Sequence, residues 1–214
     1  VPLINSSNEA DASDFFFTTL PIQPAEKGYY VFPVNMVKRT MEADGLADAG
    51  LVHSADPKRL GALFNADTIL YVEIQKWESN YNVLSASTTV SFRYNLKSAK
   101  TGASVWLNEA THTLASSSSS GNIFADLIVT AISGAINSMR SDYTPIANMA
   151  NTIALSTEGR GIPSGPYSPL FGSEADVKAY PATGSGWVGG PEPESASAVA
   201  ETASEVKSKE SSDR

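Results

Sequence analysis

Residues 84–96 alternate between apolar and polar side chains with a period of two. A period of two is produced only by an extended strand, because successive side chains of a strand point to opposite faces of a sheet. The sequence therefore predicts a long strand with one face on a core and one face in water, as antiparallel sheets allow. The inward set is Leu84, Ala86, Thr88, Val90, Phe92, Tyr94 and Leu96, and the outward set is Ser85, Ser87, Thr89, Ser91, Arg93 and Asn95.

Four further strands are expected around this one. The stretch "ADTILYVEIQKW" at 66–77 is apolar in its first half, and 104–114 returns after the turn Lys100-Thr101-Gly102 as an antiparallel partner. The run "YYVFP" at 29–33 predicts a short strand buried on both faces. Residues 1–5 resemble the end of a strand, so we expect the chain to begin within a strand and any targeting segment or anchor to lie upstream.

Helices are predicted between and after the strands. Apolar side chains recur at three- and four-residue steps most clearly over 123–139 and again over 145–155. Asp56-Pro57 combines an N-cap residue with proline at the first helical position, and Gly45 fits the end of a helix that contains Met41. The fold class is therefore α/β, of the mixed α+β kind, with a central mixed sheet of about five strands covered by helices.

The 214 residues suffice for one core of ordinary size followed by a tail. We expect an α/β domain over 1–157, a Gly/Pro-rich extension over 158–190 and an acidic tail over 191–214, with the stable core ending near Leu170. The tail contains only Val and Ala as apolar residues, so burial does not offset its ordering entropy and it is predicted to be disordered.

Composition excludes several classes of function. The net charge is −8, whereas nucleic-acid binding depends on clustered Lys and Arg, so DNA, RNA and anionic membrane surfaces are disfavoured as partners. The chain has no Cys, which removes disulfides, thiolate metal sites and cysteine nucleophiles. No apolar stretch reaches the length of about 18 residues that a membrane-spanning helix needs.

Few ionisable residues are candidates for chemistry. His53, on a predicted loop, and His112, on a strand, have no second ligand at metal-binding spacing, so no metal site and no cofactor are expected. Glu73 has two interpretations: a general base with a raised pKa, or a solvated side chain on the outer face with Gln75 and Trp77, paired across the sheet with Arg93. The second interpretation is favoured.

Two other features are weighed in the same way. Gly159-Arg160-Gly161 with Gly165 lacks the Gly-Lys-Ser/Thr ending of a phosphate-binding loop and is interpreted as a surface loop. Small residues on the predicted helix 123–139 allow close approach of another subunit, although the same stripe also suits a helix that covers the sheet. Polar strand residues also invite a protein partner. The candidate interface comprises Ile123, Leu127, Ala131, Gly134 and Ala135 with Thr89 and Ser91.

Four stretches carry a resemblance to a known family: "GYYVFPVNMV" (28–37), "GLADAGLVH" (45–53), "FNADTILYVEIQKW" (64–77) and "GIPSGPYSP" (161–169). Over about residues 1–170 the chain resembles a family of bacterial outer-membrane lipoproteins of unknown biochemical function, which includes a neisserial surface antigen. The fold that this implies is similar to the N-terminal domain of TolB, the curli-secretion lipoprotein and the lipoprotein activator of penicillin-binding proteins. In such relatives the domain is a non-catalytic scaffold that binds envelope proteins or itself. Members carry a signal peptide and a lipidated Cys, so the resemblance implies a lipid anchor upstream of Val1.

The leading hypothesis is thus a non-enzymatic outer-membrane lipoprotein that forms a homodimer or ring, contacts other cell-envelope proteins and helps to assemble a transport or secretion system. One alternative is a hydrolase of cell-wall or surface polymer built around Glu73 or an acidic pair. The other is a small-ligand binding module, which requires an enclosed apolar pocket with a few converging polar groups.

Overall fold

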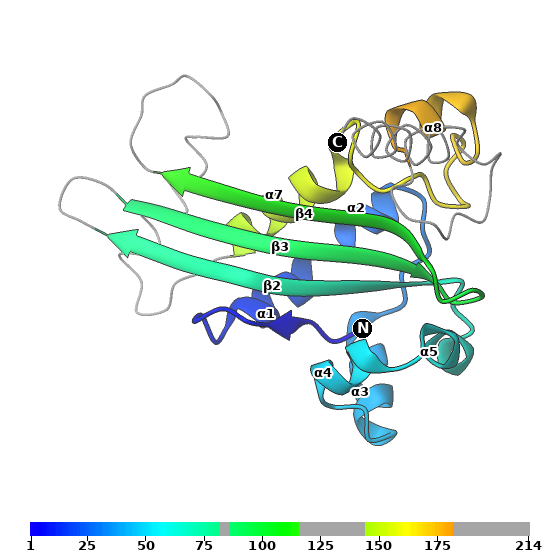
Figure 1. The fold of residues 1–214 in the computed structure, drawn as a ribbon, viewed down its shortest axis with the longest axis horizontal. Coiled ribbons are helices and arrows are strands. Elements are labelled where there is room, and N and C mark those ends of the chain that lie inside the picture. The colour runs from blue at the N-terminus through cyan, green and yellow to red at the C-terminus, as the bar shows by residue number, and fades with distance from the viewer. Residues whose placement is uncertain (82–85, 116–143, 182–214) are drawn as a thin grey trace, which may run out of the picture.

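The computed structural model describes residues 1–81, 86–115 and 144–181. Its strands form one mixed sheet in the order β1-β2-β3-β4, in which β1 is parallel to β2 and the other neighbours are antiparallel (Figure 1). The elements are β1 (Ile4–Asn5), α1 (Ala12–Thr19), α2 (Ile22–Glu26), α3 (Val34–Ala43), α4 (Ala49–Ser54), α5 (Pro57–Phe64), β2 (Thr68–Tyr81), β3 (Ala86–Ser98), β4 (Ser104–Ala115), α7 (Thr144–Ser156) and α8 (Glu174–Ala179). The mixed α/β fold class is confirmed.

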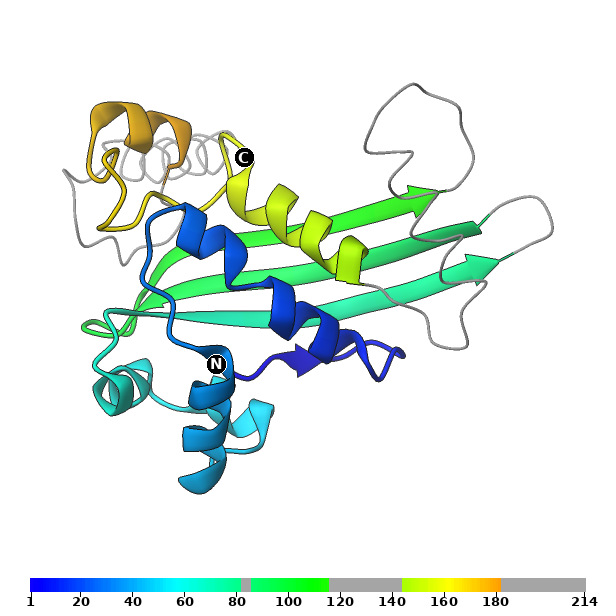
Figure 2. The same cartoon turned by 180° about the vertical axis from the view of Figure 1, so that it is seen from behind.

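The sheet and three helices make two layers. Helices α1, α2 and α7 lie across one face of the sheet (Figure 2), and the core between the layers contains Phe16, Trp77, Phe92, Trp106 and Ile146. Phe16 is central to this core, because the centre of its ring lies 4.2 Å from the ring centre of Phe92 and 6.3 Å from that of Trp77. Aromatic pairs at these separations add to the free energy gained from burying their area.

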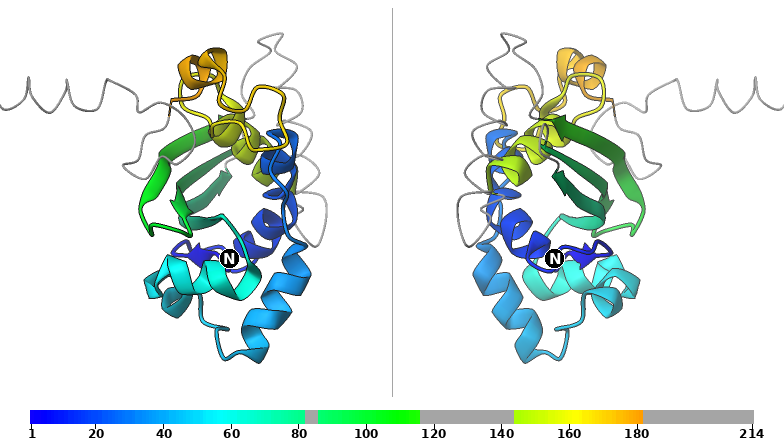
Figure 3. Two further views of the ribbon diagram at one scale, coloured as in Figure 1. Left: turned by 90° about the vertical axis from the view of Figure 1, so that its right-hand side faces the viewer. Right: turned by 90° about the vertical axis from the view of Figure 1, so that its left-hand side faces the viewer.

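Helices α3, α4 and α5 lie together beyond the side of the sheet that β1 and the beginning of β2 form (Figure 3). They enclose a second apolar cluster, formed by Met41, Val52 and Leu60 with Ile69 and Tyr71 from the beginning of β2. Ile69 and Tyr71 point away from the main core, so the first residues of β2 are buried on both faces. Farther along β2, β3 and β4, no helix of the described residues covers the outer face of the sheet (Figure 1).

A β-bulge in β2 corrects the prediction for Trp77. Ile74 pairs with Phe92 and Lys76 pairs with Ser91, so Gln75 is an extra residue without a counterpart on β3. The bulge shifts the alternation by one position. Glu73 precedes the bulge and faces outward as predicted, whereas Trp77, which follows the bulge and was predicted on the same solvent face, is in the core with 3% of its surface exposed.

The predicted strand at 29–33 is wrong, which explains why the described sheet has four strands instead of about five. Residues 29–33 form no strand, and Tyr30 is 66% exposed. The neighbouring backbone binds a different segment: Gly165 N donates to Lys27 O at 2.8 Å and Tyr167 N donates to Gly28 O at 2.9 Å. The main chain just before this run therefore bonds to segment 165–167 and not to an edge of the sheet, where β1 pairs with Glu73 and Ile74 of β2.

Only the first part of the glycine-rich segment 159–165 is the surface loop that its composition indicates, since Gly159 and Arg160 are exposed. Residues 161–165 are buried, and Trp106 Nε1 donates to Arg160 O at 2.9 Å. A Cβ at Gly161 would lie 2.5 Å from Leu155 O, and one at Gly165 would lie 2.5 Å from Gly28 O. Glycine is required here because main chain packs directly against main chain.

Helix α8 fixes the end of this segment from the other side. Ser164 N and Oγ both donate to the buried carboxylate of Asp176, at 3.0 and 2.5 Å. The side chain of Ser173 caps α8 by accepting from Asp176 N. Segment 161–165 and α8 are therefore held together by a buried carboxylate whose partners are all neutral donors.

Helices begin where the sequence has a clear capping residue. Asp56 accepts from Lys58 N at 2.9 Å and begins α5, as predicted, and α7 covers the predicted 145–155. His53 lies in α4, not on a loop, because Asp48 caps that helix by accepting from Leu51 N at 2.7 Å. The predicted helix 123–139 and the tail 191–214 lie outside the described residues.

Candidate functional site

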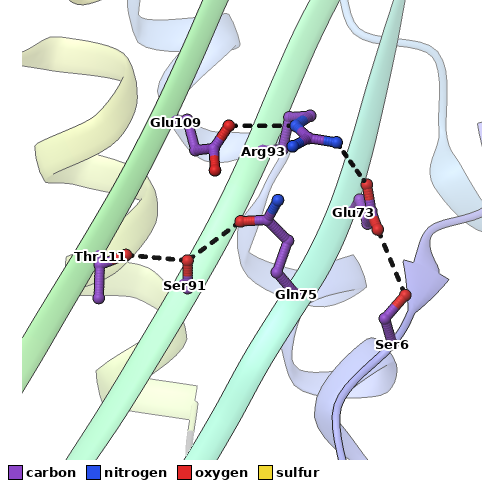
Figure 4. Close-up of polar contacts among 7 residues, drawn as sticks. All are labelled: Ser6, Glu73, Gln75, Ser91, Arg93, Glu109 and Thr111. Carbon is purple, nitrogen blue, oxygen red and sulfur yellow. Dashed lines mark hydrogen bonds and ion pairs between the residues drawn. The ribbon is translucent and has the colours of Figure 1, made fainter.

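An ion-pair triad occupies the open outer face of the sheet (Figure 4). Arg93 of β3 lies between Glu73 of β2 and Glu109 of β4, with its Nη1 3.4 Å from Glu73 Oε2 and its Nε 3.2 Å from Glu109 Oε2. The strand register places these three residues directly opposite one another. Their side chains are 30 to 57% exposed, so solvent screens each pair and each contributes about 1 kcal/mol or less to stability.

Neutral polar side chains and the exposed ion pair of Lys76 with Glu78 continue this face along the strands. Ser91 Oγ donates to Gln75 Oε1 at 3.1 Å and lies 2.9 Å from Thr111 Oγ1, while Thr89 and Thr113 are bonded across β3 and β4 at 3.1 Å. The bulge directs Gln75 toward this network. With its amide reversed, Gln75 donates to Ser91 and Glu109 and accepts from Arg93, which joins both rows into one network.

The structure describes some of the predicted interface residues and not others. Thr89 and Ser91 both lie on the outer face, as the alternation indicates. Ser91 is only 9% exposed because its neighbours cover it, whereas Thr89 is partly exposed. Ile123, Leu127, Ala131, Gly134 and Ala135 lie outside the described residues.

Glu73 has the position expected for a solvated strand residue. It lines neither of the two pockets described for this structure, and its carboxylate interacts with Arg93 and with Ser6 Oγ at 3.3 Å. Glu73 and Glu109 do converge, but each is paired with the shared guanidinium of Arg93 at an open surface. A general acid or base must lie within hydrogen-bond reach of a bound substrate, and neither described pocket places one beside Glu73.

Within the part of the chain that the structure describes, neither histidine belongs to a group of three metal-binding side chains. His53 Nε2 is 2.9 Å from Pro2 O, and its ring packs edge-on against Tyr71. His112 Nε2 is buried among the described residues without a hydrogen-bond partner. Burial lowers the pKa of both rings; the positive charge of Arg160 lowers the pKa of His112 further, while the bond to Pro2 O opposes the shift at His53.

These lowered pKa values predict a loss of stability in mild acid. Since the folded protein favours the neutral rings, their contribution is complete above the unfolded pKa of about 6.5 and is lost as pH falls through the folded pKa. The free energy of unfolding, measured by urea denaturation at pH 7, 6 and 5, should therefore decrease. The variant His53→Gln with His112→Gln should show a shallower decrease, and an unchanged slope would contradict the assignment.

An apolar cavity of about 170 Å³ is the second candidate site. Segment 29–33 forms part of its wall, together with residues from α1, α3, α5 and the beginning of β2. Lys38 and Thr68 are its only lining residues that are neither apolar nor aromatic. The sequence run that predicted a strand thus encloses a cavity, and no local pattern distinguishes these two outcomes.

No helix among the described residues is long and apolar enough to cross a bilayer. In sequence, the chain is 27% identical over 139 residues to the "Putative lipoprotein NMB1124/NMB1162" of Neisseria meningitidis serogroup B (strain ATCC BAA-335 / MC58). That match covers 65% of this chain and 65% of the relative, so it spans slightly less than two thirds of the relative's own length.

Among solved structures, lipoprotein GNA1162 from Neisseria meningitidis matches with a TM-score of 0.53 and 28% identity, over 64% of this chain and 94% of that one. A PelC dodecamer from Paraburkholderia phytofirmans matches with a TM-score of 0.32 and 20% identity, over 52% of this chain and 66% of that one, which is too distant to inform the assembly of this protein. The family model described as "Putative lipoprotein GNA1162-like" matches residues 1–167. The chain therefore belongs to this lipoprotein family and is a lipid-anchored protein of the bacterial cell envelope.

Proposed function

We propose that this protein is a non-catalytic envelope lipoprotein that self-associates through the outer face of β2, β3 and β4 and so provides a scaffold for other envelope proteins. The observation that carries the proposal is the open face itself, which no described helix covers beyond the first residues of β2 (Figure 1). Its charged side chains are the triad of Glu73, Arg93 and Glu109 and the ion pair of Lys76 with Glu78, and its other side chains are mostly short and neutral. Because each of these charges has an oppositely charged partner on the face, another surface can approach without desolvating an isolated charge.

The triad also suits contact between two copies. In a two-fold symmetric interface the same patch meets itself, so a residue on one copy can contact a different residue of the patch on the other. Arg93 has a carboxylate on each side, so the Arg93 of a second copy can interact with Glu73 or Glu109 without creating a new unpaired charge. Leu107, 42% exposed on β4, adds apolar area at the same face.

A charge placed on the outer face tests this proposal. Thr113 is exposed on β4, and Thr113→Glu would place two like charges close together in a symmetric interface. We expect the solution mass, measured by light scattering at about 100 µM, to be that of a dimer or larger ring for the unmodified protein and that of a monomer for Thr113→Glu. The matched control is Thr18→Glu on α1, an exposed position on the helical side of the sheet.

The control should leave association intact, and both variants should unfold within about 1 kcal/mol of the unmodified protein, as surface substitutions usually do. An unmodified protein that stays monomeric at high micromolar concentration would refute self-association. Association that survives Thr113→Glu but is lost in Ala131→Glu or Ala135→Glu would instead assign the contact to the predicted helix 123–139. Crosslinking in intact envelopes followed by affinity capture would then identify the other partners.

A further inference from the structure

The apolar cavity beneath segment 29–33 lies where the two apolar clusters meet. Leu96 and Ile162 of the main core and Leu60 and Ile69 of the second cluster contribute to its wall, and all four are at most 6% exposed. Tyr30 and Lys38, in contrast, are exposed, so the cavity extends from buried aliphatic side chains to a mouth at the surface. Apolar sites with one or two polar groups at the entrance are typical of small-ligand pockets.

The size of the cavity selects the ligand. A dry apolar cavity of about 150 Å³ binds a molecule as large as benzene. The cavity here, of about 170 Å³, holds about six methylene groups if each is given the roughly 30 Å³ that a water molecule occupies in the liquid. The polar atom of Tyr29 is not available to a ligand, because its hydroxyl donates to Pro163 O at 3.0 Å. Apart from Thr68 at the beginning of β2, the interior therefore offers apolar contact.

Lys38 is the cationic residue at the mouth of the cavity. Lys38 Nζ lies 6.0 Å from the ring centre of Phe17, another residue of the cavity wall. None of the ion pairs found among the described residues involves Lys38, so its charge is not neutralised by a neighbouring carboxylate. An apolar interior with an unneutralised cation at its entrance is complementary to an aliphatic chain that ends in an anionic head group.

We propose that this cavity binds one acyl chain of an anionic amphiphile, with the chain beneath segment 29–33 and the head group beside Lys38. Both a free fatty acid and a phospholipid have this chemistry, and a lipid-anchored envelope protein is close to both. Segment 29–33 is suited to form the wall of such a site, because no hydrogen bond within a sheet fixes its position.

A series of chain lengths tests the proposal. Each buried methylene is worth about 0.8 kcal/mol, which corresponds to about a fourfold gain in affinity. The dissociation constant of fatty acid carboxylates, measured by titration calorimetry below their micellar concentrations, should therefore fall about fifteenfold from hexanoate to octanoate. It should then level off in decanoate and dodecanoate, because the cavity is full. Affinity that keeps rising with length would indicate nonspecific partitioning and would overturn the proposal, as would the absence of binding.

Two variants test the two ends of the site. Lys38→Gln should weaken octanoate binding about two- to fivefold, in line with an exposed ion pair, and leave the binding of octan-1-ol unchanged. Arg39→Gln is the matched control, since Arg39 is the next cation on α3 and does not line the cavity. Val37→Phe places a larger side chain in the wall and should weaken octanoate binding more than tenfold.

Equal loss of affinity in Lys38→Gln and Arg39→Gln, or octan-1-ol binding as tightly as octanoate, would overturn the role of Lys38. If Val37→Phe does not fold, the chain-length series and the Lys38 variant still decide the question. Titration with octanoyl lysophosphatidylglycerol distinguishes the sources. Tighter binding than octanoate supports a phospholipid, weaker binding supports a free fatty acid, and binding of neither ligand refutes the proposal.

Discussion

Replacement of Gly165 by alanine should lower the free energy of unfolding by about 3 kcal/mol. The new Cβ would lie 2.5 Å from Gly28 O and 2.6 Å from the carbonyl carbon of Gly28, and main chain cannot turn aside as a flexible side chain does. Overpacking of this kind costs about 1–3 kcal/mol. Separation of the two segments would also break the bonds from Gly165 N to Lys27 O and from Tyr167 N to Gly28 O, each worth about 1 kcal/mol.

The free energy of unfolding of Gly165→Ala, measured by urea denaturation, should be compared with that of the control variant Gly50→Ala. Gly50 lies inside α4, where the added methyl group would meet only the side chain of Asp48 at 3.1 Å. Alanine is favoured over glycine in a helix, so this control should change stability by about 1 kcal/mol or less. If Gly165→Ala were as stable as Gly50→Ala, the close approach of residues 28 and 165 would be wrong.

Two single-residue deletions in β2 should have opposite outcomes. Deletion of Gln75 removes the extra residue of the bulge, after which Ile74, Lys76 and Trp77 still pair with Phe92, Ser91 and Val90. Only surface hydrogen bonds of the Gln75 side chain are lost, and we expect a folded protein destabilised by about 1 kcal/mol.

Deletion of Glu73 should unfold the protein, because Gln75 remains and Ile74 and Gln75 each move by one position relative to β3. Regular pairing of the shortened strand would place Ile74 opposite Arg93 on the outer face and Gln75 opposite Phe92 in the core. Exposing a buried Ile costs about 1.5–3 kcal/mol and burying an unpaired amide costs a further 1–3 kcal/mol. The sum is comparable with the total stability of many domains, so this variant should be largely unfolded.

Circular dichroism and denaturant titration of both deletions test the bulge. Lost secondary structure for the Gln75 deletion, or native stability for the Glu73 deletion, would contradict the observed register. The Glu73→Ala substitution separates the loss of the ion pair from the loss of register. It removes only an exposed pair and should cost less than about 1 kcal/mol.

Signals that are local in the sequence predicted their structures well. The alternation over residues 84–96 identified the inner and outer faces of β3, and Asp56-Pro57 identified the beginning of α5. Both patterns act through neighbours in the chain: side chains alternate because the strand is extended, and a cap binds an amide two residues away. The pairing of Arg93 with Glu73 was predicted for the same reason, since antiparallel neighbours lie directly opposite each other.

Parts of the candidate sites could not be derived in this way. The apolar run at 29–33 is equally suited to a buried strand or a cavity wall, and its hydrophobicity is the same in both. A weak signal was available in Pro33 and in the nearby Gly28, with φ of +86°, because proline and a left-handed glycine both interrupt sheet hydrogen bonding. The burial of residues 161–165 had no signal beyond the glycines themselves.

The sequence by itself determined the fold class, the two faces of the long strand and the outward position of Glu73, since each depends on the period of side chains along one segment. Only the tertiary structure decided that Trp77 faces inward, that residues 29–33 enclose a cavity and that Gly161 and Gly165 are buried. These three outcomes depend on which main-chain groups pair across distant segments: a bulge exists only relative to the partner strand, and a run becomes a strand only if its main chain pairs with the edge of a sheet. Nearly every residue type carries the same backbone N–H and C=O groups. The backbone hydrogen bonds that decide these three outcomes therefore leave no pattern of side chains in the sequence.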